Sequence, residues 1–327
     1  MHDFEAERKQ TEILRILSRA ENPIGARIIA RGLEKAGFFI GERGVRYYLH
    51  LLDDNGLTRN QGYLGRIITK KGREELENAA VFDRVGFIMS KIESLAYKTT
   101  FDPAKMDGEI IINLSYIDKN ESDRALETIK KVFLAGLAVS PYVGILDEGE
   151  EVEGVVVPKG RIGLATACSI TIDGLLLKAG IPTHPKYGGI VQVQKGKALR
   201  FTDVIAYRGS TLDPLEVFMA RGMTSVNKVV KTGSGKILVN FREIPAVARE
   251  RAETLLEMLV EIGFSAVLEV GEVNRPLLSV PVEKGRVGVA IVGGINALAA
   301  IEELGVKTET KAISALMNIK QMRKIIG

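Results

Sequence analysis

Apolar residues recur at helical spacing in three stretches of the first 54 residues. The first stretch, residues 5–20, places its apolar side chains on one stripe and its charged side chains on the other face. Pro23 interrupts this pattern, because proline cannot continue a helix. A second stripe begins at Ile24, and Gly37 stands where it would close. A third stripe runs from about Glu42 to Asp54. The spacing therefore predicts three helices.

A different pattern follows the third helix. Leu57–Arg59 and Tyr63–Thr69 alternate in character around the turn residues Asn60–Gly62, as in a β-hairpin. Lys70–Asn78 returns to helical spacing. Three helices, a hairpin and a closing helix are the elements of a winged helix-turn-helix. That motif places its third helix in the major groove of DNA and its hairpin on the backbone or in the minor groove.

Basic residues concentrate in this segment. Between Ile24 and Arg73 there are ten lysines and arginines but only four acids, whereas the whole chain has a formal net charge of +4. We therefore expect this segment to bind double-stranded DNA through phosphates and base edges. The candidate DNA-binding residues are Arg43, Arg46, Tyr47, His50, Arg59 and Arg66. Two alternatives remain: a solvated basic face, or a winged helix that binds protein.

The rest of the chain contains an internal repeat. A linker helix is predicted over residues 80–98. Beyond it, Lys159–Ala165 reappears as Lys284–Ala290 at an offset of 125, and Gly108–Asn113 matches Gly235–Asn240 at an offset of 127. Ordered matches at nearly one offset indicate a duplicated domain.

Each repeat reads strand, helix, strand, strand, helix, strand, which is the β-α-β-β-α-β order of a ferredoxin-like unit. The halves span about 105–210 and 232–327, and the fourth strand of the first half is expected near 190–194. The predicted fold class is α+β. A winged helix-turn-helix over residues 1–80 precedes a duplicated ferredoxin-like regulatory domain over residues 81–327. Two such units can pack together or exchange edges with a second chain.

Small residues stand where a predicted strand meets a helix, at Ala167–Thr171 and at Val292–Asn296. Small side chains let backbone N–H groups approach a ligand, and a helix N-terminus favours an anion. The segment His184–Gly189 adds a titratable ring, a cation and a hydroxyl. The candidate effector-binding residues are Cys168, Ser169, Thr171, His184, Tyr187, Gly188, Gly293, Gly294 and Asn296. The glycines can also serve packing, Cys168 can be a small buried hydrophobe, and His184 can be a turn residue.

Composition excludes several classes of protein. The single cysteine, Cys168, excludes a disulfide framework and a Cys-based zinc site. No apolar run approaches the ~20 residues that span a bilayer, and no apolar signal core follows Met1. We therefore expect a cytoplasmic protein with no membrane partner. No spacing matches a metal site, a phosphate-binding loop or a nucleophile–base pair, so we expect no catalytic residue, metal or cofactor.

The segments Glu42–Leu49 and Leu52–Thr58 look like the winged helix of the NrpR family, the nitrogen-regulatory repressors of methanogenic and related archaea. Ser90–Glu93, Tyr97–Pro103 and Gly209–Pro214 look like its regulatory domain. The resemblance implies a homodimeric repressor of nitrogen-assimilation genes that binds a palindromic operator and is released by the effector 2-oxoglutarate.

Other functions remain open at this point. Some members of the family carry two tandem regulatory domains, whereas this chain carries one, so a second chain with such domains is a possible partner. A regulator that senses a different metabolite is another alternative, as is a metabolic enzyme acting on an amino acid or keto acid. 2-Oxoglutarate is a dianion that needs at least two clusters of N–H or cationic donors, and the two helix starts would provide them.

Overall fold

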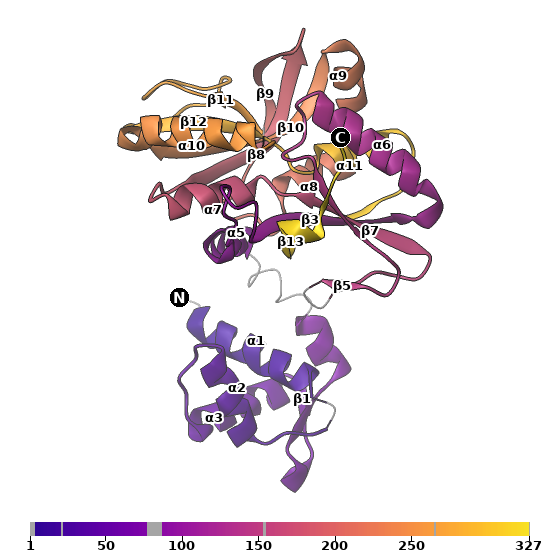
Figure 1. Cartoon of the computed structure of the whole chain (residues 1–327). Helices are drawn as coiled ribbons and strands as arrows, with labels where there is room; N and C mark the ends of the chain where they lie inside the picture. The colour runs from indigo at the N-terminus through magenta and orange to yellow at the C-terminus, as the bar shows by residue number, and fades with distance from the viewer. Residues whose placement is uncertain (1–3, 21, 77–86, 153–154, 265, 327) are drawn as a thin grey trace. The chain divides into compact units, whose positions relative to one another are not determined.

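The computed structural model describes residues 4–20, 22–76, 87–152, 155–264 and 266–326. The chain divides into two units, Met1–Val85 and Gly86–Gly327 (Figure 1). Each unit has its own hydrophobic core. The expected boundary between residues 80 and 81 lies outside the described residues. So do the predicted end of the closing helix and the predicted start of the linker helix.

The first unit has the predicted order of elements. Its helices are α1 (Phe4–Ser18), α2 (Ala26–Lys35) and α3 (Glu42–Asp54). Its hairpin strands are β1 (Thr58–Asn60) and β2 (Arg66–Ile68), and residues 70–76 are helical. The apolar stripes of the helices meet in one core, which includes Ile13, Leu33 and Leu49. The predicted winged helix-turn-helix is therefore present.

The hairpin differs from the prediction at its tip. Gly62–Leu64 forms a short 3-10 helix, so the second strand begins at Arg66 and not at Tyr63. Ile24 and Arg66 exchange backbone hydrogen bonds of 3.1 and 3.0 Å, which adds a third segment to the hairpin. Gly65 permits this close approach, because a Cβ there would lie 2.4 Å from the carbonyl carbon of Ile24. Ile24 thus belongs to the wing and not to the second helix.

The second unit starts with α5 (Phe87–Lys98) and then repeats one pattern twice. The first half consists of β3 (Glu109–Asp118), α6 (Ser122–Leu134), β4 (Tyr142–Leu146), β7 (Arg161–Ala167), α7 (Ile170–Lys178) and β8 (His184–Gln194). The second half consists of β10 (Gly235–Pro245), α10 (Arg249–Glu261), β11 (Val267–Val270), β12 (Arg286–Val292), α11 (Asn296–Glu303) and β13 (Glu309–Asn318). The predicted β-α-β-β-α-β order of each half is confirmed.

The fourth strand of each half pairs with the first strand of the other half. β8 pairs antiparallel with β10, and β13 pairs antiparallel with β3. The two five-stranded sheets therefore have the orders β13-β3-β7-β4-β14 and β11-β12-β10-β8-β9. One continuous core contains buried residues of both halves. Each of these sheets therefore contains strands of both halves, 105–210 and 232–327.

Some elements lie outside the repeated pattern. They are β5 (Glu151–Val152), β6 (Val155–Val156), β9 (Lys197–Ala206), α8 (Pro214–Ala220), α9 (Val226–Thr232) and β14 (Arg323–Lys324). The segment His184–Gly189 forms the start of β8, so the fourth strand is longer than the predicted 190–194. α5 packs on α7, and α11 packs on α6. No helix in the described part of the chain is long and apolar enough to cross a membrane.

Candidate functional site

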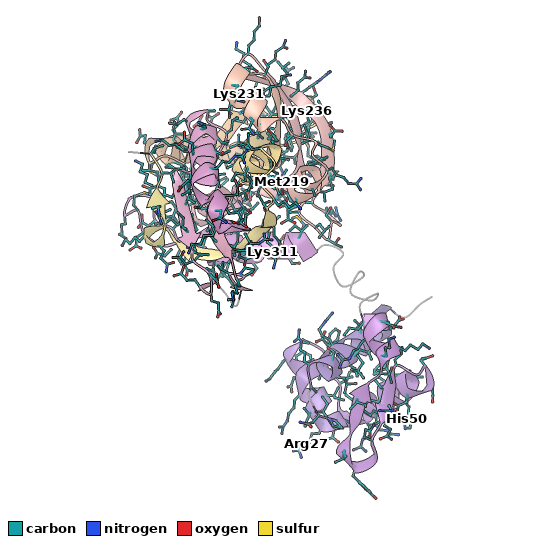
Figure 2. The ribbon with its side chains drawn as sticks, turned by 90° about the vertical axis from the view of Figure 1, so that its right-hand side faces the viewer. Arg27, His50, Met219, Lys231, Lys236 and Lys311 are labelled. Atoms are coloured by element: carbon teal, nitrogen blue, oxygen red, sulfur yellow. The ribbon has the colours of Figure 1, made fainter. Side chains whose placement is uncertain are left out.

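The α3 helix presents opposite faces to the core and to solvent. Its buried residues are Val45, Leu49 and Leu52. Its exposed residues include Arg43, Arg46, Tyr47 and His50, the last labelled in Figure 2. Arg46 Nη2 lies 3.1 Å from Glu42 Oε2, but such exposed pairs are weak, so the arginine stays available to an anion. Four of the predicted DNA-binding side chains therefore lie on one exposed face.

The two wing arginines have different environments. Arg59 is exposed on β1. Arg66 Nε lies 2.8 Å from Asp53 Oδ2, and the two side chains are only 14% and 20% exposed. Arg66 therefore ties the wing to the end of α3, and its predicted phosphate contact stays a prediction. Tyr63 and Leu64, which the sequence pattern did not select, are exposed at the tip of the wing.

In the second unit, the same contact fixes the start of the second helix of each half. Thr171 Oγ1 accepts a hydrogen bond from the Ile111 N–H at 3.0 Å, and Asn296 Oδ1 accepts one from the Leu238 N–H at 2.8 Å. Each side chain also donates to the carbonyl of the same strand residue, at 3.2 and 2.9 Å. Positions 171 and 296 are related by the repeat offset of 125. Both predicted effector residues are thus engaged with the backbone of a first strand.

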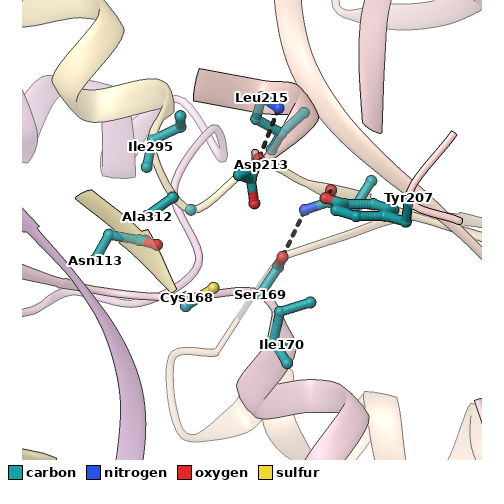
Figure 3. A pocket seen from close by; sticks show the side chains of 11 residues that line it. Asn113, Cys168, Ser169, Ile170, Tyr207, Asp213, Leu215, Ile295 and Ala312 are labelled. Carbon is teal, nitrogen blue, oxygen red and sulfur yellow. Dashed lines mark hydrogen bonds between the residues drawn. The ribbon is translucent and has the colours of Figure 1, made fainter. Parts of the chain in front are cut away.

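Residues from both helix starts line one cavity (Figure 3). Three pairs of equivalent residues contribute to it, namely Asn113 with Asn240, Ser169 with Gly294, and Ile170 with Ile295. Cys168, Tyr207 and Asp213 add to the lining. Its volume is about 10 Å³, about the space of one water molecule. The structure therefore brings Cys168, Ser169 and Gly294 of the predicted site together.

Buried hydrogen bonds organise the Ser169 end of this cavity. Asn240 Nδ2 donates to Ser169 Oγ at 2.6 Å, and the Tyr207 hydroxyl donates to Asn240 Oδ1 (Figure 3). Asp213 Oδ1 accepts from the Leu215 N–H at 2.6 Å and caps α8. The lining therefore combines buried, hydrogen-bonded polar side chains with apolar ones.

Burial also changes the titration of the lining groups. It raises the pKa of Asp213 to about 7, so this carboxyl is partly protonated near neutral pH. It raises the pKa of the Cys168 thiol to about 12, which keeps the thiol uncharged. Among the residues that the structure describes, no group of three His, Cys, Asp or Glu side chains is arranged to hold a metal ion.

The remaining predicted effector residues lie outside this lining. His184 is exposed on β8, and Tyr187 lines a separate hollow on the second sheet. Gly188 and Gly293 both pack against the start of α8, where a Cβ would come within 2.7 and 2.8 Å of its side chains. Close packing therefore accounts for both glycines.

Four polar lining residues were missed by the sequence pattern. Asn113 and Asn240 end the matching segments Gly108–Asn113 and Gly235–Asn240. Both strands have an asparagine at the same position of an otherwise apolar segment, and this shared polar residue could have indicated a functional position. Tyr207 and Asp213 carried no such signal, because they lie between β9 and α8, outside the repeat.

Comparison with known proteins agrees with these features. Residues 85–324 match the family described as NrpR regulatory domains NRD1 and 2, and residues 11–76 match the ribonuclease R winged-helix domain. The chain is 44% identical to the global nitrogen regulator NrpRI of Methanosarcina mazei, over 99% of this chain and 100% of that protein. It is 37% identical to the global nitrogen regulator NrpR of Methanococcus maripaludis over 96% of this chain, and spans 54% of that protein.

A solved structure adds to these matches. The chain resembles a nitrogen repressor-like protein from Methanococcus jannaschii with a TM-score of 0.63 and 33% identity, over 73% of this chain and 98% of that chain. The relatives are named as regulators, and this chain is likewise a regulatory protein and not an enzyme. Taken with the fold and the paired helix starts, these matches show that the chain belongs to the NrpR family of nitrogen regulators.

Proposed function

We propose that this protein represses transcription of nitrogen-assimilation genes by binding a palindromic operator as a homodimer, and that 2-oxoglutarate releases it. One observation carries the proposal. A winged helix with an exposed basic α3 face is joined in one chain to a duplicated domain whose two helix starts line one cavity that also has polar side chains. The first feature fits DNA, and the second brings polar side chains of both halves together where a small molecule could control DNA binding.

On this proposal, α3 enters the major groove and the wing lies along the backbone. Arg43, Arg46, Tyr47 and His50 contact bases or flanking phosphates. Arg59 contacts a phosphate, because a hairpin side chain is less rigidly placed for reading bases. A homodimer presents two such helices to half-sites about one helical turn (~34 Å) apart. Palindromic DNA matches the two-fold symmetry of such a dimer.

The effector acts through the regulatory unit. The cavity of about 10 Å³ is too small for 2-oxoglutarate, so binding requires the walls to separate. The walls belong to both halves, and such a movement changes how the halves pack. A coupling of roughly 1–3 kcal/mol, usual for allostery, changes operator affinity about 5- to 150-fold.

A second candidate assigns sensing to a partner chain with NrpR regulatory domains. It is favoured by one observation, that this chain spans only 54% and 55% of two of its relatives. In this version the winged helix binds DNA, while another chain, or a different metabolite, supplies the response.

Operator binding titrated with 2-oxoglutarate tests both candidates. DNA that the purified chain selects from a random pool would serve as the operator, at fixed moderate salt. Loss of binding as 2-oxoglutarate rises supports the self-contained repressor. Tight binding that ignores 2-oxoglutarate favours the second candidate. Failure to select any DNA would overturn the DNA-binding function itself.

A further inference from the structure

The cavity between the helix starts is not symmetric, although its frame is duplicated. At one end, Asn240 Nδ2 donates to Ser169 Oγ at 2.6 Å. At the equivalent end, Gly294 stands in place of Ser169, so Asn113 meets no hydroxyl. Asn113 is 1% exposed, and its Nδ2 has no hydrogen-bond partner among the described residues. A buried donor without a partner is unfavourable and calls for a reason.

The orientation of the Asn113 amide is determined by its other contact. Asn113 Oδ1 accepts a hydrogen bond from the Ile313 N–H at 3.0 Å. Rotating the amide by 180° would place the Nδ2 donor against the Ile313 N–H, which is also a donor. Nδ2 therefore lies on the side away from this N–H. A Cβ at position 294 would lie 2.6 Å from this Nδ2, so the donor lies against Gly294, and both residues line the cavity.

We propose that Asn113 is a ligand-binding residue, whose Nδ2 donates to a carboxylate oxygen of a small organic acid at the Gly294 end of the cavity. The proposal rests on the effector function above and gives the ligand an orientation. α11 begins beside this end, and a helix N-terminus favours negative charge. Gly294 has no side chain that could pair with Asn113 Nδ2, whereas at the other end Ser169 Oγ is already the partner of Asn240.

Asn113 also connects the ligand to β13, the strand that pairs with the first strand of the other half. Ile313 lies in a bulge of β13, between Lys311 and Ala315. Its φ of 50° is uncommon for a β-branched residue, so the bulge depends on the contacts that hold it. Asn113 Oδ1 holds this bulge, so a ligand that binds Asn113 Nδ2 changes the position of the side chain on which the bulge depends. Because β13 joins the sheet of the other half, the ligand reaches the packing between the halves.

Isothermal titration calorimetry of the full chain with 2-oxoglutarate tests the assignment. Asn113→Asp keeps the acceptor for the Ile313 N–H but replaces the free donor with an oxygen. We expect this variant to bind 2-oxoglutarate at least tenfold more weakly than the wild type. Asn274→Asp makes the same change at an exposed loop residue whose Oδ1 accepts from the Gly285 N–H. It should bind like the wild type, and thermal unfolding would verify that both variants fold.

A second variant keeps the test open if Asn113→Asp does not fold. Ser169→Gly frees Asn240 Nδ2, so both ends would offer a donor and binding should be at least as tight as in the wild type. Binding more than tenfold weaker would place the ligand at the Ser169 end and overturn the assignment. Unchanged binding by a folded Asn113→Asp would overturn it as well, while effector binding stands. A wild-type chain that does not bind 2-oxoglutarate would instead overturn the effector proposal, and the inference with it.

Discussion

Arg242, on β10, forms a buried ion pair with Asp173, on α7, and so joins the two halves of the duplicated domain. The side chains are 1% and 2% exposed. Arg242 Nη1 also lies 3.5 Å from the Ser169 carbonyl oxygen, at the start of α7 beside the cavity. The equivalent positions hold Ser115 and Leu298, which cannot form such a pair. The contact therefore belongs to the Ser169 end of the cavity alone.

This ion pair predicts a large loss of stability when one partner is removed. Asp173→Ala leaves a buried guanidinium without its counter-charge, which we expect to lower the free energy of unfolding by about 3–5 kcal/mol. Urea unfolding followed by circular dichroism would measure it. The double variant Asp173→Ala with Arg242→Met removes both charges and should be more stable than the single variant. A double variant as unstable as the sum of both single changes would contradict this account.

The exchanged fourth strands predict that neither half folds alone. A fragment of residues 87–210 lacks β13 and so leaves one edge of β3 unpaired, and its β8 has no β10. We expect this fragment to be unfolded or aggregated, whereas residues 87–327 fold cooperatively. Circular dichroism and thermal unfolding of both proteins provide the comparison. A monomeric 87–210 fragment with a cooperative transition would argue against this coupling.

The exposed face of α3 predicts how DNA binding depends on salt. If Arg43 contacts a phosphate, Arg43→Ala should reduce the slope of log K against log salt by about 0.9. The same holds for Arg46→Ala. If either arginine reads a base instead, its loss should relax sequence preference at one position. Arg275→Ala, at an exposed arginine of the regulatory unit, is the matched control. If both variants keep the wild-type salt slope and the wild-type sequence preference, α3 is not part of the DNA interface.

Substitutions of the two wing arginines should affect different properties, the stability of the winged-helix unit for Arg66 and the affinity for DNA for Arg59. Arg66→Ala breaks the ion pair with Asp53, so we expect it to lower the stability of the winged-helix unit by about 1 kcal/mol. Arg59→Ala should leave the unfolding temperature unchanged and weaken operator binding. Thermal unfolding and fluorescence anisotropy with labelled operator would test both. The prediction is wrong if Arg66→Ala weakens DNA binding without any change in unfolding temperature.

Asp213 predicts a dependence of effector binding on pH. Burial raises the pKa of this carboxyl to about 7, so it gains a proton as the pH falls through that value. The ionised form is the one that burial disfavours, so the free energy of unfolding falls as the pH rises from the unfolded pKa of 3.8 to about 7. Protonation also removes a negative charge from the cavity that receives an anion. We expect 2-oxoglutarate to bind roughly two- to tenfold more tightly at pH 6 than at pH 8.

Asp213→Asn is the control for this pH dependence, because asparagine also caps helices well but does not titrate. Calorimetric titrations at several pH values should give a nearly flat profile for this variant. A pH dependence that survives in Asp213→Asn would have to come from another group.

The sequence by itself determined the elements and their order. Helical spacing with a basic third helix predicted α3 to the residue, and the 125-residue offset predicted two β-α-β-β-α-β halves. It also placed Ser169 and Gly294 at equivalent helix starts. These features are local, since a repeating pattern of apolar residues specifies an element and its buried face from neighbouring positions alone. The tip of the wing was not predicted, because Gly65 and Ile24 are far apart in the sequence and come into contact only in the folded unit.

Only the tertiary structure decided which strands pair and what lines the cavity. An apolar strand pattern says which faces are buried but not which partner supplies the hydrogen bonds. β3 and β10 begin with similar apolar sequences, so their pattern does not say which of them pairs with β8 and which with β13. Packing of the whole domain selects the exchanged arrangement. The same packing brings Tyr207 and Asp213 from outside the repeat to Asn113 and Asn240. Contacts between residues this far apart in the chain leave no periodic trace in the sequence.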